Sequence, residues 1–266
     1  MRPAVLLAIS SALATGCKSP SNPGGPDLGD GPGHIPGTPG LGGHGLAYYK
    51  LADANYPASA TAISTPRLAT GATGSTIVVG VGRGDATRFA GASLTDTAGN
   101  APYQEQGPQP YTAFPESGTA LYTFAGARGG PGFQVTTSTG QNAKGQLDEI
   151  TIAAVEVLEG TRIQDQQWNE IVQPATPVAV TSNPVTTTGP STLVAFWWGD
   201  GFPRTPQTAS PTSDSGFSLV DSNAHETDSF VQCAVAVKNV SAAGSYSITW
   251  VSTPVQGAQL WLVAVQ

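Results

Sequence analysis

The sequence predicts an all-β protein built from two tandem antiparallel β-sandwich domains that follow a disordered tether. The first supporting observation is composition, because 33 glycines and 22 prolines in 266 residues supply frequent turns. The second is that apolar runs of roughly four to eight residues recur between these turns, whereas helix-forming residues never accumulate at helical spacing. The third is an internal repeat in the order of these runs, which indicates two copies of one domain.

The chain opens with an export signal at residues 1–17. Arg2 precedes the apolar run Ala4–Ile9, and small residues then lead to Cys17. The segment resembles a bacterial lipoprotein signal peptide, which implies that Cys17 becomes the lipidated first residue of the mature chain. The apolar run is shorter than the about 20 residues of a membrane-spanning helix. We therefore expect an exported protein that meets a membrane through the lipid on Cys17; an ordinary secretory signal is the alternative.

The residues after Cys17 form the predicted tether. By resemblance to lipoprotein sorting, Lys18 implies the outer membrane or cell surface of a bacterium. Residues 18–46 are dominated by glycine and proline and offer little apolar surface to bury, so we expect them to be disordered. His34 and His44 fall in this segment and are interpreted as solvated loop residues instead of metal ligands.

Charge and cysteine content limit the function of the folded part. The net charge is −7 and only 11% of the residues are charged, which argues against a nucleic-acid partner. If Cys17 carries lipid, Cys233 remains alone, so we expect a fold without a disulfide. Cys233 alternates with valines in Val231–Lys238 and is interpreted as a small buried residue of a strand.

The internal repeat divides the folded part into two domains, expected at residues 47–160 and 161–266. Three pairs of segments correspond in order: Ser75–Val81 with Ser191–Trp197, Phe133–Thr136 with Tyr246–Thr249, and Ala154–Val157 with Leu262–Val265. The spacing between partners shortens along the chain, as it does when a second copy has shorter loops. This alignment makes Ile77 equivalent to Leu193 and Val135 equivalent to Ile248.

Each copy is expected to contain six strands. In the first copy they lie near Ala62–Leu68, Thr76–Gly82, Ala92–Thr95, Ala120–Ala125, Phe133–Thr137 and Glu149–Leu158. In the second copy they lie near Val178–Val185, Thr192–Trp198, Phe217–Val220, Val231–Lys238, Ser245–Val251 and Gln259–Val265. Regularly spaced short strands of this kind are typical of antiparallel sandwiches.

One turn carries a resemblance to known proteins. Asp96–Asn100 is expected to form a hairpin turn in which Gly99 supplies a positive φ. The stretch Ser93–Asn100 is similar to the turn of many immunoglobulin-like or jelly-roll repeats in bacterial extracellular proteins, most of them without an assigned activity. The resemblance implies that the sandwiches are of one of these two types.

Adjacent tryptophans give the main indication of a binding or domain-joining surface. Trp197 and Trp198 lie on one predicted strand, so their side chains point to opposite faces, and both faces are apolar. One face is expected to form the core of the second sandwich. The other is expected to meet the first domain, with Trp168 of the connector packing there. The alternative is a carbohydrate-stacking platform beside Asp200.

Metal and nucleophilic sites receive little support from the sequence. The loop at 221–228 is rich in oxygen ligands, and Asp221, Asn223 and Asp228 are candidates for a structural calcium site, although the loop lacks the glycine and glutamate of an EF-hand. A solvated acidic loop is the favoured interpretation. We expect no other cofactor. The sequence contains no Gly-x-Ser-x-Gly, His-Glu-x-x-His or Walker-type motif.

Two functions from different classes follow from these observations. We expect a non-enzymatic surface protein, structural or adhesive, whose partner is a polysaccharide or another surface protein. The alternative is a secreted glycoside hydrolase, which needs two carboxylates at a defined separation. The carboxylates considered for that role are Asp148, Glu149, Glu156 and Asp200.

Overall fold

The computed structural model describes residues 40–49, 62–84, 89, 91–138, 149–172, 179–200, 208–224, 231–253 and 256–266. These residues are all-β, as the sequence predicts, apart from one turn of 3-10 helix at Ser213–Ser215. The strands are β1 (Gly40–Tyr49), β2 (Ala62–Ser64), β3 (Leu68–Ala69), β4 (Thr73–Gly84), β5 (Leu94–Asp96), β6 (Gln104–Pro110), β7 (Gly118–Arg128), β8 (Pro131–Phe133), β9 (Val135–Ser138), β10 (Glu149–Leu158), β11 (Ile163–Ile171), β12 (Val180–Thr181), β13 (Val185–Thr187), β14 (Ser191–Asp200), β15 (Thr208–Pro211), β16 (Ser218–Ser222), β17 (Val231–Val240), β18 (Gly244–Tyr246), β19 (Thr249–Thr253) and β20 (Gly257–Val265).

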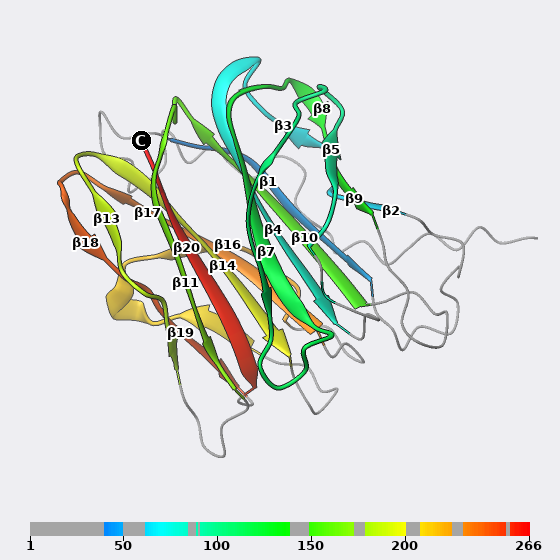
Figure 1. The fold of residues 1–266 in the computed structure, drawn as a ribbon. Coiled ribbons are helices and arrows are strands. Elements are labelled where there is room, and N and C mark those ends of the chain that lie inside the picture. Colours follow the sequence, from blue (N-terminus) through cyan, green and yellow to red (C-terminus); the bar gives the residue numbers. More distant parts are fainter. Residues whose placement is uncertain are drawn as a thin grey trace, which may run out of the picture.

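The two halves of the chain have the same sheet topology (Figure 1). The first half has a large antiparallel sheet with strand order β1-β10-β4-β7-β6 and two small sheets, β2-β9-β5 and β3-β8. The second half repeats this arrangement as β11-β20-β14-β17-β16, β12-β19-β15 and β13-β18. Every strand of the first copy therefore has a counterpart ten strands later, and the predicted tandem architecture is confirmed.

The repeat extends to single hydrogen bonds. In the first copy the backbone N–H of Thr65 donates to Val135 O at 2.9 Å, and the N–H of Val135 donates to Thr65 Oγ1 at 3.1 Å. In the second copy Ser182 and Ile248 form the same pair of bonds, at 2.9 and 3.2 Å. Val135 and Ile248 thus occupy equivalent positions, as the sequence alignment of the two copies predicts.

The turn after β5 has the predicted glycine, but it does not close a hairpin, because β5 pairs with β9 and the next strand, β6, pairs with β7 in the large sheet. The Asp96 carboxylate accepts hydrogen bonds from the backbone N–H groups of Ala98 and Asn100 and from the Tyr103 hydroxyl, at 2.9, 3.0 and 2.6 Å. Gly99 has φ 73°, a left-handed conformation that glycine adopts at little cost. Burial and the bond to Asp96 raise the pKa of the Tyr103 hydroxyl. The turn is therefore fixed by its own side chains.

The predicted tether at 18–46 is wrong at its end, because residues 40–46 belong to β1, which pairs with β10. The reason is a buried carboxylate that the composition did not reveal. Glu156 accepts hydrogen bonds from the backbone N–H groups of Gly43 and Gly71, at 3.0 and 2.8 Å. A Cβ on Gly42 would collide with the same carboxylate, so the absence of a side chain at Gly42 leaves the space that Glu156 occupies. Residues 18–39 and the signal segment with Cys17 lie outside the described residues.

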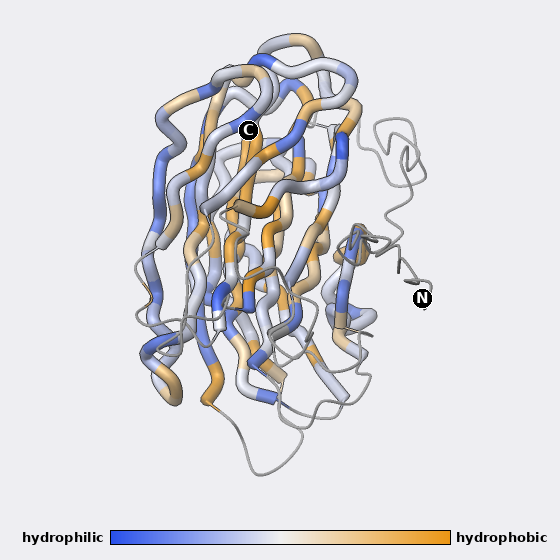
Figure 2. The backbone as a smooth tube through the Cα atoms, turned by 90° about the vertical axis from the view of Figure 1, so that its right-hand side faces the viewer, coloured by the Kyte–Doolittle hydropathy of each residue, from blue (hydrophilic) through white to orange (hydrophobic). Residues whose placement is uncertain are grey.

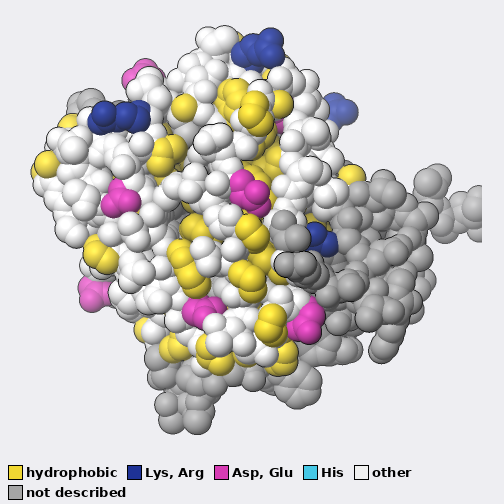
Figure 3. Space-filling view, in the orientation of Figure 1, with side chains coloured by type: hydrophobic (Ala, Val, Ile, Leu, Met, Phe, Trp, Pro, Cys, Tyr) yellow, Lys and Arg dark blue, Asp and Glu magenta, His cyan; other side chains and the backbone are white. Residues whose placement is uncertain are grey.

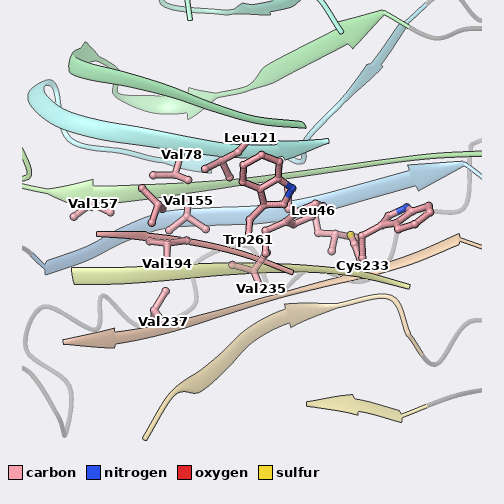
Figure 4. Close-up of a cluster of buried hydrophobic side chains, with 14 of the residues drawn as sticks. Leu46, Val78, Leu121, Val155, Val157, Val194, Cys233, Val235, Val237 and Trp261 are labelled. Carbon is pink, nitrogen blue, oxygen red and sulfur yellow. The ribbon is translucent and has the colours of Figure 1, made fainter. Parts of the chain in front are cut away.

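Three hydrophobic cores divide the molecule into four layers. One core lies inside the first domain, around Val79, Ile152 and Phe133, and a second lies inside the second domain, around Trp197, Trp250 and Leu260. The third core lies between the two large sheets and draws side chains from both domains (Figure 4). Figure 2 shows that hydrophobic residues concentrate in the central strands. The domains are therefore joined face to face through their large sheets.

Candidate functional site at the domain interface

The paired tryptophans lie in different cores. Trp197 points into the second domain, where its ring stacks on Trp250 with the centroids 6.1 Å apart and the planes 8° from parallel. Trp198 points into the interface, where Tyr111 of the first domain meets it edge-on at 5.7 Å. Both tryptophan side chains are buried. This is the arrangement expected from the sequence, and neither ring is open to a polysaccharide, as the alternative of a stacking platform beside Asp200 requires.

The first domain makes room for the aromatic side chains of the second. A Cβ on Gly80 would lie under 3.0 Å from the ring of Phe196, and a Cβ on Gly82 would lie under 3.0 Å from Trp198. In the alignment of the two copies, these glycines occupy the positions equivalent to Phe196 and Trp198. The same strand thus carries large side chains in one copy and none in the other. The two large sheets are complementary because the copies diverged at these positions.

The stacking of the large sheets has approximate two-fold symmetry. β4 contacts β14 at the centre, while β10 contacts β17 and β20 contacts β7 on either side. At one edge of the interface β1 contacts β16. The symmetric counterpart at the other edge is the approach of β6 to β11. There the Tyr111 hydroxyl donates to Ile171 O at 3.4 Å, and Thr112 bonds the Glu170 carboxylate through its hydroxyl.

Trp168 lies in β11, an edge strand, and not in a connector as the sequence analysis expected. Its ring is half-buried and packs against Trp261, with the ring centroids 6.1 Å apart. Its equivalent in the first copy is Leu46. Trp168 pairs with Trp261 and Leu46 pairs with Ala153, and the alignment of the two copies makes Trp261 equivalent to Ala153. Leu46 is 1% exposed, so one edge of the interface is closed where the other is partly open.

Polar side chains hold the β6 and β11 edge together at one end. The Thr119 hydroxyl donates to Gln259 Oε1 at 2.6 Å and accepts the indole N–H of Trp261 at 2.7 Å. Gln259 Nε2 donates to Gln109 O at 3.1 Å and to the Glu170 carboxylate at 3.2 Å. The bonds of Thr119 and that of Gln109 cross the interface, and together with the bond to Glu170 they satisfy groups that would be costly to bury alone. No sequence motif marks these polar residues as a group.

Asp200 ends β14 at the interface and is half-buried. Burial raises the pKa of its carboxyl to about 7. Its Oδ2 atom is shielded from solvent and accepts no hydrogen bond within the described part of the chain. Glu149, which is buried, pairs in register with Gly84, the first-copy equivalent of Asp200. Two of the four carboxylates considered for hydrolysis therefore lie at the same end of the interface.

The other two carboxylates are not placed there. Glu156 lies at the opposite end of β10 and holds the backbone of β1, which is a structural task. Asp148 lies outside the described residues.

Of the candidate calcium residues, the structure describes Asp221 and Asn223. Asn223 is buried and binds the backbone of Cys233 on β17: its N–H donates to Cys233 O at 3.0 Å, and its Oδ1 accepts the N–H of Cys233. Asp221 lies on β16 across the interface from His44, which belongs to β1 and not to a solvated tether. Asp228 lies outside the described residues. Within the described ranges, no group of three or more His, Cys, Asp or Glu side chains is placed to hold a metal.

Two charge effects accompany this packing. Burial lowers the pKa of His44, although the nearby Asp221 opposes the shift. Burial also raises the pKa of the Cys233 thiol, which lies in the interface core. Both groups are therefore neutral components of the interface near pH 7.

No protein-family model, curated protein or solved structure matches this chain significantly. Among the described residues, no helix has the length and apolar character needed to cross a membrane.

Proposed function

We propose that this chain is an exported, membrane-tethered, non-enzymatic surface protein that serves as a structural or adhesive binding module. The main support is the pairing of the domains. Phe196 and Trp198 pack against Gly80 and Gly82, and this packing joins the two sandwiches into one body. Such a body presents a surface of constant geometry, which suits a binding or structural role. The lipoprotein-like segment ending at Cys17 would supply the anchor.

Replacing the lipidation residue tests the anchor. Cys17→Ser should release the protein from membrane fractions and leave an unprocessed precursor, because lipidation requires the thiol. Cys233→Ser is the matched control, since that thiol is buried and should not affect the anchor. The measurement is immunoblotting of membrane and soluble fractions. An unchanged membrane fraction for Cys17→Ser would contradict the proposal.

A secreted glycoside hydrolase is the second candidate, and one observation favours it. A carboxyl with a pKa of about 7, as burial gives Asp200, is suited to a general acid, and Glu149 lies at the same end of the interface. Hydrolysis of polysaccharides by the wild-type chain, lost in Asp200→Asn and retained in the exposed-site control Asp214→Asn, would support this function. Absence of hydrolysis by the wild-type chain would leave the binding role.

A further inference from the structure

The β6 and β11 edge of the domain interface, here called the open seam, differs from its symmetric counterpart. At the β1 and β16 edge, Leu46 and Tyr48 of β1 are buried. The equivalent residues of β11, Trp168 and Glu170, are both half-buried. In the orientation of Figure 1, which has β7 and β11 in front, Figure 3 shows a band of hydrophobic side chains running between the two domains, with acidic groups beside it.

The side chains of the open seam combine an indole with uncharged amides. Register places Gln104, Gln106 and Gln109 of β6 on the interface side, opposite Thr123, Leu121 and Thr119 of β7. Within the described part of the chain, the side-chain amides of these three glutamines make no hydrogen bond. Gln166 and Trp168 line the same face of β11, and Gly107 lies against Trp261 beneath them. An amide supplies both a donor and an acceptor, which is what a hydroxyl group needs.

Two further observations indicate a neutral ligand. Gln166 Oε1 is shielded from solvent and accepts no hydrogen bond from the described residues, so it lacks the donor that a buried acceptor requires. Glu170 is the one carboxylate on the interface side of β11, and it is already bonded by Thr112 and Gln259. A charged ligand would find no free counter-charge among these side chains.

We propose that the open seam binds a neutral polysaccharide, with the face of Trp168 as its stacking platform and Gln106 and Gln166 as hydrogen-bonding groups. The inference rests on the proposed function and names its ligand class. An aromatic face packs against the apolar face of a sugar ring, while the amides meet its hydroxyls. At the rise per residue of a β-strand, β6 and β11 are each about 20 Å long or more. The seam is therefore better suited to an extended polysaccharide chain than to a single sugar.

The test measures retention of the full chain, purified in detergent, on insoluble cellulose, chitin and starch, with alginate as a charged competitor. The wild type should be retained on at least one neutral polysaccharide. Trp168→Ala should weaken retention about tenfold or more, and so should the double variant Gln106→Ala/Gln166→Ala, which leaves the packed ring intact. Phe217→Ala is the matched control, because it removes a half-buried ring of the same domain that lies over Lys238 and away from the seam.

Each outcome decides one point. Retention that falls in both seam variants and persists in Phe217→Ala supports the proposal. Wild-type levels in both seam variants overturn the site, and an equal loss in Phe217→Ala overturns it as a general effect of stability. Release by alginate overturns the neutral ligand class. If the wild type is retained on none of the three solids, the seam proposal fails, while the fractionation of Cys17→Ser still tests the proposed function independently.

Discussion

At the scale of single residues, Glu156 and Asp200 carry the same functional group but have different surroundings and different roles. Glu156 is held by two backbone N–H groups, whereas Asp200 has one oxygen without a partner in the described part of the chain. The two backbone hydrogen bonds fix the Glu156 side chain against β1, whereas burial favours the neutral acid of Asp200. The position of each residue in its sheet sets this difference.

We expect Glu156→Gln to destabilise the protein by about 1–3 kcal/mol, because the amide nitrogen would face a backbone N–H and leave it unsatisfied. The affected groups are the N–H of Gly43 or that of Gly71. Urea unfolding followed by fluorescence measures the change. Glu116→Gln, at an exposed site, is the control and should remain within about 0.5 kcal/mol of the wild type. Equal stability of the two variants would show that the carboxylate does not hold β1.

Asp200 predicts a pH dependence with a definite sign. Its folded pKa of about 7 lies above the ordinary value of 3.8, so the folded state retains a proton that the unfolded state loses. The contribution of Asp200 to stability should therefore be fully present below pH 4, fall as the pH rises to about 7, and then level off. The total effect is roughly 2–4 kcal/mol.

Asp200→Asn should remove this contribution, so the variant should lose less stability than the wild type between pH 4.5 and 8. The measurement is urea unfolding at several pH values, with Asp214→Asn as the exposed control. A slope in Asp200→Asn that equals the wild-type slope would assign the pH dependence to other groups.

At the scale of elements, the interface depends on a contrast between two equivalent strands. β4 presents Gly80 and Gly82 where β14 presents Phe196 and Trp198. Large side chains on both strands would overlap, and small ones on both would leave a cavity. The contrast explains why β14 can be apolar on both faces without exposing a sticky surface.

Gly82→Ala should therefore cost about 1–3 kcal/mol through overpacking against Trp198. Combining it with Trp198→Leu should cost less than the sum of the single changes, because the smaller side chain leaves room for the new methyl group. Thermal unfolding of the four members of the cycle measures the coupling. Gly189→Ala is the control, since its methyl group would meet only the side-chain amide of Gln266, at 3.2 Å. Additive effects would mean that the two residues do not share the contact.

At the scale of the whole molecule, the interface core makes the two domains one body. It draws buried side chains from seven strands of the two large sheets, among them Val155 and Leu121 of the first domain and Val194 and Val235 of the second (Figure 4). Removing one domain would expose this entire surface of the other. Stability is therefore shared between the domains.

We expect the protein to unfold in a single calorimetric transition, with equal calorimetric and van't Hoff enthalpies. Trp198→Ala, which removes one of the two buried tryptophan side chains of the interface core, should lower the midpoint through a loss of about 3–5 kcal/mol. Two resolved transitions in the wild type would show that the sandwiches unfold independently.

The sequence determined the features that depend on local patterns. Alternating apolar residues and turn chemistry predicted the all-β class, the duplication, the turn at Asp96–Asn100 and most strands of both copies. The strands it missed were β1, β6, β11 and β15. All four are edge strands, rich in glycine, proline or polar residues, so their side chains carry little of the alternation on which prediction depends.

Only the tertiary structure decided what lies between the domains. Trp198 and Asp200 were identified as candidates from the sequence, but the first is packed against Gly82 and the second is half-buried at the end of the interface. The half-open position of Trp168 and the glutamines of β6 became a candidate site only when β6 met β11. Strand periodicity fixes which residues share a face, whereas the partner of that face is set by segments more than a hundred residues away.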